Sequence, residues 1–495
     1  MTTISSYILA IDQGTSSTKT LLINEKGEAV ARAVESLTSY HTNGFAEQVP
    51  DEILNNALAS VSSCIQAFKD QGGDVKQIKA CGISNQRETF IVWDKTGTPL
   101  YNAVLWQCKR SVEICERLKK QGMDQTIKEK TGLIIDPYFS GTKLIWLYEN
   151  VDKIKQAVDA GEAYFGTVDT WLLYKLSDGK SYCTDYTNAS RTMFFNLSTL
   201  AWDNELLELF NLSMLNLPEC KPSSYHFGET DFNRLLGKPI AISAMIGDSH
   251  SAAFGEGCFS TGTAKATLGT GCSILMNVGD KVQYSDNGMV STVCWSTRDT
   301  VQYALEGVIV TCGATIEWLK NELNIFTESK ETEAIATSLA DNGGVYLVPA
   351  FSGLGAPHWD MSRKASITGL TFSTGKSHIV RAALESITYQ IKDVITAMEK
   401  DAGVFLDQLM IDGGISSNQF IVQFLADLLG KKVINIGIAD VSALGAAYLA
   451  GLESGVFKSI EDLRNLQQKR TTYTPSNEGK VQLYYEGWKK AIAGS

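Results

Sequence analysis

The same short pattern occurs twice in the chain, once in each half: an apolar strand, a turn that contains Gly-Thr, and a second apolar strand. The first copy spans residues 7–24 and breaks at residues 12–14, and the second spans residues 266–277 and turns at residues 269–271. Two β-runs that flank a connection rich in Gly, Ser and Thr predict a hairpin. Because each half opens with such a hairpin, we expect two related halves with a boundary near residues 252–257.

Each hairpin is followed by segments that predict a mixed sheet covered by helices. Hydrophobic periodicity and length predict strands over residues 78–83, 90–93, 240–246 and 409–411, and helices over residues 50–69, 418–429 and 444–452. For the helix over residues 418–429 we expect Ser416 or Ser417 as the N-cap and Gly430 just after the C-terminus.

The length and the absence of a linker suggest how these halves are organised. A chain of 495 residues predicts two to four domains at roughly 150 residues each. No low-complexity segment separates the halves. We therefore expect an N-terminal lobe over residues 1–252 and a C-terminal lobe over residues 253–495, packed around a cleft.

The charge balance limits the partners of the chain. It contains 44 Lys and Arg residues against 55 Asp and Glu residues, a formal net charge of −11. Sequence-independent binding to nucleic acid needs net positive charge, so we expect no nucleic-acid partner. A nucleotide is still compatible with this charge, because a few backbone amides and one metal ion can bind phosphate locally.

The sequence also predicts a cytoplasmic protein with no membrane partner. No run approaches the ~18 uncharged apolar residues of a membrane span, and the N-terminus lacks the basic start and cleavage site of a signal peptide. The ten cysteines are scattered without a CxxC pair, which indicates reduced thiols. The five histidines show no zinc-ligand spacing.

Three Gly-rich turns have the composition of phosphate-binding sites. The segment DQGTSSTK, residues 12–19, supplies Gly14, four hydroxyls and Lys19. Successive amides in such a turn form an anion-binding concavity, and Asp12 at a strand end could hold Mg²⁺. The turns at residues 268–273 and 412–414 repeat this chemistry. An ordinary tight turn explains each one alone, but together they predict a nucleotide held between two lobes.

Two polar segments at strand ends suggest an acceptor site. Asp248 follows the strand over residues 240–246 and is either a helix N-cap or a general base. Arg87 and Glu88 lie in a polar loop and could exchange hydrogen bonds with the hydroxyls of a polyol. Trp106 and Tyr138 are either core residues or the apolar walls on which such a carbon chain lies.

The residues in these segments closely resemble those of the FGGY carbohydrate kinases, and within them the glycerol kinases, over nearly the full length. The motifs that carry the resemblance, in the order of the family, are DQGTSSTK, SNQRET, LWQC, DPYFSGTKLIWLYEN, TVDTWLL, TDYTNASRT, GDSHSAA, LGTGC, YALEG, VPAFSGLGAPHWD, DGG and ALGAAYLAG. The resemblance implies an α/β fold of the actin-like ATPase (ribonuclease H-like) type, with two related lobes around a nucleotide cleft. It also implies ATP and Mg²⁺ as cofactors.

The resemblance further implies roles for individual residues. Asp248 would be the catalytic base and, with Asp12, would serve the metal. The acceptor would be bound by Arg87, Glu88, Trp106, Tyr138, Asp248, Ser249 and Ser273. The nucleotide would be bound by Thr15, Ser16, Ser17, Lys19, Thr270, Gly313, Glu317, Gly414 and Asn418.

The sequence departs from the glycerol kinase pattern at several of these positions. Ser249 stands where a Gln is usual and Ser273 where a Phe is usual, so we expect a pocket that is wider and more polar on one side. Glu317 replaces a common Gln, and Lys19 stands where the family often has Arg. The stretch from residue 226 to 238 lacks the Gly/Arg-rich loop with which some bacterial members bind fructose 1,6-bisphosphate.

The expected function is ATP-dependent phosphorylation of glycerol to sn-glycerol 3-phosphate. Ser249 and Ser273 keep a second acceptor open, a larger polyol of four or five carbons such as erythritol. A third hypothesis is an actin-like or chaperone-like ATPase that transfers phosphate only to water, because one fold hosts many functions. We expect the chain to form a homo-oligomer, either a dimer or a tetramer.

Overall fold

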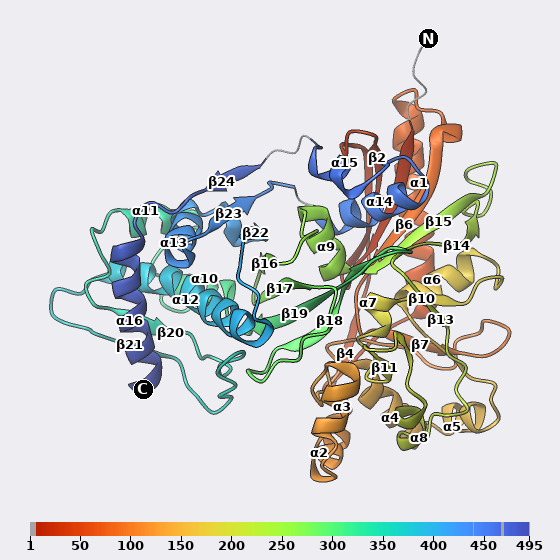
Figure 1. Ribbon diagram of the computed structural model, residues 1–495, viewed down its shortest axis with the longest axis horizontal. Coiled ribbons are helices and arrows are strands. Elements are labelled where there is room, and N and C mark those ends of the chain that lie inside the picture. Colours follow the sequence, from red (N-terminus) through yellow and green to blue (C-terminus); the bar gives the residue numbers. More distant parts are fainter. Residues whose placement is uncertain (1–5, 439, 467–469, 495) are drawn as a thin grey trace.

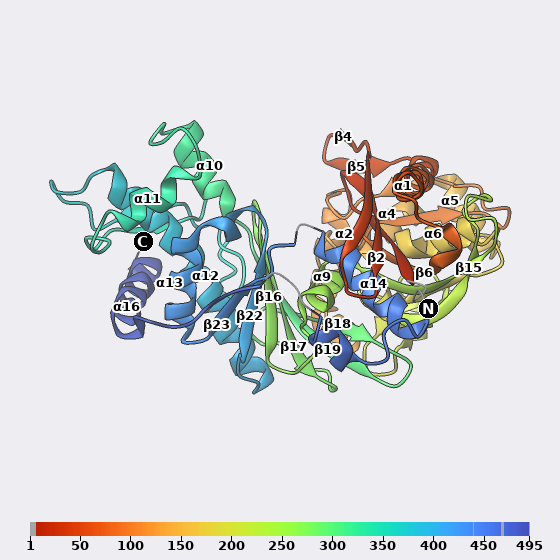
Figure 2. The same cartoon turned by 90° about the horizontal axis from the view of Figure 1, so that it is seen from above.

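Two mixed β-sheets, one in each lobe, carry the architecture (Figures 1 and 2). The computed structural model describes residues 6–438, 440–466 and 470–494. The first sheet contains, in spatial order, β14 (Ser224–Thr230), β15 (Ile240–Gly247), β6 (Ile78–Asn85), β1 (Tyr7–Gln13), β2 (Ser17–Asn24) and β3 (Ala29–Ser36). The second contains β18 (Val290–Ser296), β19 (Val301–Ile309), β17 (Cys272–Gly279), β16 (Thr263–Leu268), β22 (Gln408–Asp412), β23 (Lys432–Asn435) and β24 (Thr471–Tyr473).

The two sheets repeat one strand order. In the first, β1 pairs with β2 as the predicted hairpin and lies parallel to β6, which in turn lies parallel to β15. In the second, β16 pairs with β17 as the predicted hairpin and lies parallel to β22, which lies parallel to β23. The expected relation between the halves is therefore confirmed at the level of strand order.

Smaller sheets and the helices complete the lobes. A five-stranded sheet contains β4 (Tyr40–Thr42), β5 (Phe45–Gln48), β8 (Ala103–Val104), β7 (Phe90–Trp93) and β9 (Tyr164–Thr167). The strand pairs are β10 (Cys183–Asp185) with β13 (Glu219–Lys221), β11 (Phe195–Asn196) with β12 (Ala201–Trp202), and β20 (Tyr346–Val348) with β21 (Ser366–Thr368). The helices are α1 (Pro50–Asp70), α2 (Val112–Lys120), α3 (Asp124–Thr131), α4 (Ser140–Asn150), α5 (Asp152–Asp159), α6 (Val168–Leu176), α7 (Tyr186–Ala189), α8 (Asn204–Leu209), α9 (Asp248–Glu256), α10 (Gly313–Asn321), α11 (Glu331–Thr337), α12 (Lys376–Ala402), α13 (Gln419–Leu429), α14 (Val441–Glu453), α15 (Ile460–Arg464) and α16 (Glu478–Gly494), with short 3₁₀ turns at Val75–Gln77 and Gly414–Ser417.

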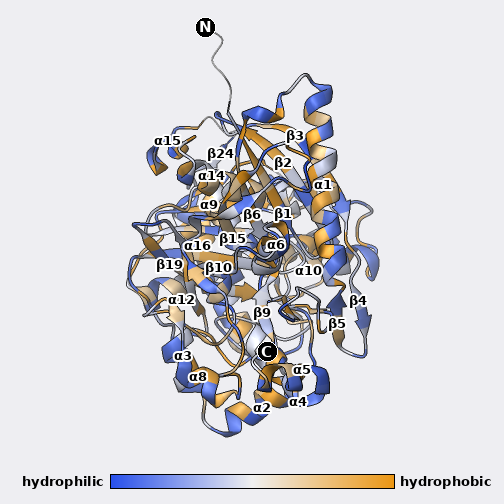
Figure 3. Ribbon diagram, turned by 90° about the vertical axis from the view of Figure 1, so that its right-hand side faces the viewer, coloured by the Kyte–Doolittle hydropathy of each residue, from blue (hydrophilic) through white to orange (hydrophobic). Residues whose placement is uncertain are grey.

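Helix α1 shows how the hydrophobic pattern determines packing. Its buried residues include Ile53, Ala57, Val61 and Phe68, which recur at helical spacing and pack on the first sheet. Hydrophobic and hydrophilic residues alternate along this helix in Figure 3. Among the described residues, no helix is both long and apolar enough to cross a membrane.

The N-cap expected for the helix over residues 418–429 was wrong. Asn418 caps α13, and its side-chain oxygen accepts a hydrogen bond from the amide of Ile421 at 3.3 Å. Ser416 and Ser417 belong to the preceding 3₁₀ turn, where their hydroxyls donate to the carbonyls of Gly413 and Gly414. These local bonds occupy the serine side chains, so the next polar residue takes the cap.

Helix α14 joins the two lobes, because it comes late in the sequence but packs on β1, β6 and β15 of the first sheet and against α9. The helices approach closely at Gly445, where an added Cβ would lie 1.8 Å from the carbonyl oxygen of Ser251. Gly255 makes the reciprocal approach, 2.5 Å from the carbonyl oxygen of Val441. The lobe division at residues 252 and 253 stays a prediction, and α14 shows that sequence halves and spatial lobes differ.

We expect Gly445→Ala to destabilise the protein by about 1–3 kcal/mol, because the new methyl group forces α9 and α14 apart. Gly479→Ala is the matched control, since this glycine is also helical but an added Cβ there meets nothing within 4 Å. Urea denaturation of both variants measures the difference. Equal midpoints for Gly445→Ala and the parent protein would refute the close contact.

Candidate active site

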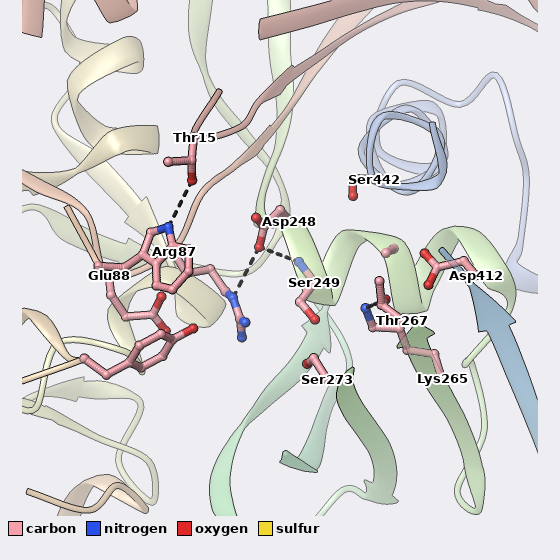
Figure 4. A pocket seen from close by; sticks show the side chains of 13 residues that line it. Thr15, Arg87, Glu88, Asp248, Ser249, Lys265, Thr267, Ser273, Asp412 and Ser442 are labelled. Carbon is pink, nitrogen blue, oxygen red and sulfur yellow. Dashed lines mark hydrogen bonds and ion pairs between the residues drawn. The ribbon is translucent and has the colours of Figure 1, made fainter. Parts of the chain in front are cut away.

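All seven residues predicted to bind the acceptor line one cavity of about 280 Å³ between the lobes (Figure 4). They are Arg87, Glu88, Trp106, Tyr138, Asp248, Ser249 and Ser273. Thr15, predicted to bind the nucleotide, lines the same cavity. The structure thus brings together residues that lie up to 258 positions apart in the sequence.

Strand register explains why these residues meet. In the first sheet, β1, β6 and β15 are parallel, with Gln13 opposite Asn85 and Gly247 opposite Asn85 across the neighbouring pairs. Their carboxyl ends therefore lie at one edge of the sheet, and the residues that follow them enter the same space. Ligands of open α/β sheets bind at this kind of edge.

Asp248 is the first residue of α9, and Gly247 occupies the N-cap position. The N-cap interpretation of Asp248 is therefore wrong. The Asp248 side chain is 38% exposed; its Oδ1 lies 3.3 Å from Nε of Arg87 and accepts a hydrogen bond from the amide of Ser249 at 2.6 Å. Figure 4 shows the carboxylate facing the cavity. It is placed to accept a proton from a bound hydroxyl.

A buried ion network holds two of the side chains that are predicted to bind the acceptor, Arg87 and Glu88, in place. Glu306, on β19 of the second sheet, pairs with the two terminal nitrogens of Arg87 at 2.9 and 3.2 Å, and with Arg191 at 2.8 Å. Arg191 also donates to Glu88 at 2.6 Å. All four residues are less than a tenth exposed. The network therefore connects both lobes beneath the cavity.

This network determines which polar atoms are left for a ligand. A guanidinium has five N–H donors; Arg87 directs Nε toward Asp248 and one N–H from each terminal nitrogen toward Glu306. One donor on each terminal nitrogen is thus left over. Glu88 accepts from Arg191 through Oε1, which leaves Oε2 as an acceptor. A pair of adjacent hydroxyls matches this set.

The charges of the network also fix protonation. The guanidinium groups of Arg191 and Arg87 overcome the burial of Glu306 and hold the pKa of its carboxyl well below the usual range. His250 lies beside the same charges, and burial together with Arg87 lowers the pKa of its imidazole well below its ordinary value. His250 is therefore neutral at pH 7. It is also fully buried.

Two aromatic rings form the apolar wall of the cavity. Trp106 and Tyr138 meet edge to face, with ring centroids 5.7 Å apart. The indole Nε1 of Trp106 donates to the hydroxyl of Thr15 at 2.9 Å, which links this wall to the first Gly-rich turn. The carbonyls of Pro137 and Tyr138 accept hydrogen bonds from buried Lys143 at 2.9 and 2.6 Å.

The residues predicted to bind the nucleotide fall into separate places. Five of them line a second cavity of about 550 Å³ in the second lobe: Thr270, Gly313, Glu317, Gly414 and Asn418. Two of these five side chains already form hydrogen bonds within the chain: Glu317 accepts from the hydroxyl of Ser329, and Asn418 donates to the hydroxyl of Thr332. Asp12, Ser16, Ser17 and Lys19 line neither cavity. Lys19 pairs instead with Asp440 at 3.2 Å and lies 3.9 Å from Asp12.

Several side chains in the site were not assigned a role from the sequence. The cavity is also lined by Lys265, Thr267, Asp412 and Ser442, and the network beneath it depends on Arg191 and Glu306. Arg191 and Glu306 lie within the motifs TDYTNASRT and YALEG. A charged residue that follows the apolar residues of YALEG was the available signal for Glu306.

A buried acidic residue, Glu256, lies at the C-terminal end of α9. Glu256 is 1% exposed, and its carboxyl group interacts with the carboxyl group of Asp412. Burial, reinforced by the nearby Asp412, raises the pKa of Glu256 well above its ordinary value. Glu256 is therefore held in its protonated form.

We expect Glu306→Gln to cost about 3–5 kcal/mol of stability, because it leaves two buried guanidinium groups without a full counter-charge. The control is Glu149→Gln, which removes an exposed pair with Arg117 and should cost about 0–1 kcal/mol. Urea denaturation at neutral pH compares them. Similar losses for both variants would show that the buried network is not held by charge.

Protonated Glu256 makes stability depend on pH. The folded state binds this proton more tightly than the unfolded state, so the contribution is complete below the unfolded pKa of about 4.3 and falls as pH rises above it. Glu256→Gln removes this loss. The free energy of unfolding of the variant, relative to that of the parent, should therefore increase steadily as the pH of the denaturation series rises from 5. A constant difference between the two across that range would contradict the assignment.

Comparison with known proteins matches the chain to one family. Residues 7–255 match the N-terminal domain and residues 264–454 the C-terminal domain of the FGGY family of carbohydrate kinases. The glycerol kinase of Alkaliphilus metalliredigens is 44% identical over 489 residues, which cover 98% of this chain and 97% of that protein. Glycerol kinase 2 of Thermotoga maritima is 45% identical and covers 99% and 98%.

Solved structures of carbohydrate kinases are similar to this chain in fold. The glycerol kinase of Plasmodium falciparum with ADP superimposes with a TM-score of 0.93 at 36% identity, covering 99% of this chain and 98% of that one. The gluconate kinase of Lactobacillus acidophilus, 22% identical with a TM-score of 0.86 over 99% of both chains, shares the fold. These matches confirm the predicted two-lobed, actin-like α/β fold. With both family domains matched and relatives aligned along almost its whole length, the chain belongs to the FGGY family of carbohydrate kinases and is a phosphotransferase.

Proposed function

We propose that the chain transfers the γ-phosphoryl group of ATP to a terminal hydroxyl of glycerol and so forms sn-glycerol 3-phosphate. The observation that carries this proposal is the cavity in which Arg87, Glu88, Trp106, Tyr138 and Asp248 meet. The names of the relatives at 44–45% identity support the same acceptor.

The leftover polar atoms suit glycerol. The two remaining N–H groups of Arg87 donate to adjacent hydroxyls, while Oε2 of Glu88 accepts from one of them. The carbon chain lies against the rings of Trp106 and Tyr138. Because the ion network fixes both charged side chains before the ligand arrives, little conformational freedom is lost on binding.

Asp248 acts as the general base. As the acceptor oxygen attacks the γ-phosphorus, Asp248 takes the hydroxyl proton, and the bond from the γ-phosphorus to the leaving oxygen of ADP breaks. The pairing of Arg87 Nε with Asp248 orients the carboxylate. Positioning and charge neutralisation supply most of the rate in reactions of this class.

The nucleotide and its metal complete the proposed site. We assign the adenine and ribose side to the second-lobe cavity at Thr270, Gly313, Glu317, Gly414 and Asn418, and the phosphates to the turn at residues 12–19. No group of three or more metal-ligating side chains occurs among the described residues, whereas Mg²⁺ usually takes one or two carboxylates plus phosphates.

The carboxylates present fit such an ion. Burial, with a further contribution from Asp248, raises the pKa of Asp12 to about 6, so a nearby cation would favour the ionised form. Asp12 and Asp248 would hold Mg²⁺, which neutralises phosphate charge when bound. The oxygens of Asp12 also receive a hydrogen bond from Ser84 at 3.0 Å, which orients the carboxylate.

The test is glycerol-dependent ADP formation by the purified protein, with Asp248→Asn as the variant. We expect Asp248→Asn to lower kcat by about 10²- to 10⁴-fold, the usual contribution of a general base. Asp159→Asn, on the exposed surface of α5, should leave kcat unchanged. A kcat within a few-fold of the parent for Asp248→Asn would remove this residue from the chemistry. ADP formation that ignores every polyol would favour an ATPase.

A larger polyol is the second candidate, because Ser249 and Ser273 both line the acceptor cavity and both are small. The hydroxyl of Ser249 is buried without a hydrogen-bond partner within the described chain, so it is available to an additional hydroxyl of a ligand. The ratio of kcat/KM for glycerol and erythritol on one preparation decides between them.

A further inference from the structure

A side cavity lies next to the acceptor cavity and is lined by residues of both halves of the chain. It has a volume of about 490 Å³, and it shares Arg87, Trp106, Tyr138, Thr267 and Ser273 with the acceptor cavity. The two cavities therefore adjoin, and Ser273 lines both of them. Of the described residues that line the second-lobe cavity, Gly269 alone also lines the side cavity.

Strand β19 forms the floor of the side cavity. Side chains alternate across a strand, so Glu306 and Val308 share one face and Ile309 points to the core on the other. Val308 is 45% exposed whereas Ile309 is 2% exposed. Val308 stands directly opposite Ser273 in the antiparallel pair of β17 and β19. Val310, 40% exposed, extends the same apolar surface.

The polar groups at the junction are already engaged. The hydroxyl of Ser273 donates to Glu306 at 3.3 Å, and the carboxylate of Glu306 is paired with Arg87 and Arg191. Beyond them the lining is mainly apolar and includes Val290, Val308, Val310, Ile134 and Trp359, with Lys109 and Asp136 as charged members. A hydroxyl against the valines would lose its water without a new partner, whereas a methylene would gain from leaving water.

We infer, on the basis of the proposed function, that the chain also phosphorylates glycerol that carries a short alkyl group on the carbon farthest from the reacting hydroxyl, such as a 1-O-alkylglycerol. The glycerol unit occupies the acceptor cavity and the alkyl group passes Ser273 into the side cavity. The free terminal hydroxyl gives its proton to Asp248 and forms the new O–P bond. The bond between the γ-phosphorus and ADP breaks.

The experiment measures kcat/KM for glycerol and for its 1-O-methyl, ethyl, propyl and butyl ethers, with ADP release coupled to detection and the product identified by mass spectrometry. We expect kcat/KM to rise about fourfold for each added methylene, which corresponds to the transfer free energy of one CH₂ group. Erythritol, whose extra carbon carries a hydroxyl, should fall below the ethyl ether. Ethers that are turned over no better than erythritol would overturn the inference.

Variants on the floor of the side cavity test whether the alkyl group binds there. Val308→Phe fills the side cavity next to Ser273 and should abolish the gain from the alkyl group while glycerol turnover is unchanged. Val310→Phe provides an independent test at the next position on the same surface. Val112→Phe is the matched control, because Val112 is also 45% exposed but begins α2, outside the cavity. If Val308→Phe lowers kcat/KM equally for glycerol and for the butyl ether, the alkyl group binds outside the side cavity.

The outcomes separate this inference from the proposed function. If glycerol and its ethers all fail as acceptors, the proposed function is wrong. If glycerol is phosphorylated but its ethers gain nothing with chain length, only the role of the side cavity is wrong.

Discussion

One carboxylate, that of Glu306, lies between two guanidinium groups, and the acceptor site depends on it. Arg87 is held at both terminal nitrogens and Arg191 at one, so each arginine has its orientation fixed before any ligand binds. A buried ion pair of this kind contributes little net stability compared with an apolar replacement, but removal of one partner is costly. The pairs fix geometry here, because they connect a strand of the second sheet to two side chains that are predicted to hold the acceptor.

The parts of the site that could be predicted are those determined by local sequence. The two Gly-Thr hairpins, the strand before Asp248 and the polar loop at Arg87 are short-range patterns, and parallel strands bring their carboxyl ends to one edge. For that reason Arg87, Glu88, Asp248 and Ser249 meet at that edge, and Trp106, Tyr138 and Ser273 reach the same cavity from other elements. Their individual roles remain predictions, because proximity alone does not assign a chemical step.

The parts that could not be predicted depend on long-range packing. Glu306 and Arg191 are 115 positions apart, and no local pattern indicates that their charges neutralise each other. The cap of α13 is Asn418 because Ser416 and Ser417 bond to carbonyls within their own turn. Glycines within a helix such as α14 indicate close packing against a neighbour, but the neighbour that requires them, α9, is known only from the tertiary structure.

The position of α14 has a consequence for how the protein is made. The sheet face formed by β1, β6 and β15 is complete in sequence once Gly247 has been synthesised, yet the helix that covers it, Val441–Glu453, begins 194 residues later. Residues such as Ile8, Ala10 and Ile246 therefore lack the helix that buries them until α14 has been synthesised. During that interval the nascent chain exposes a broad apolar surface of the kind that chaperones bind.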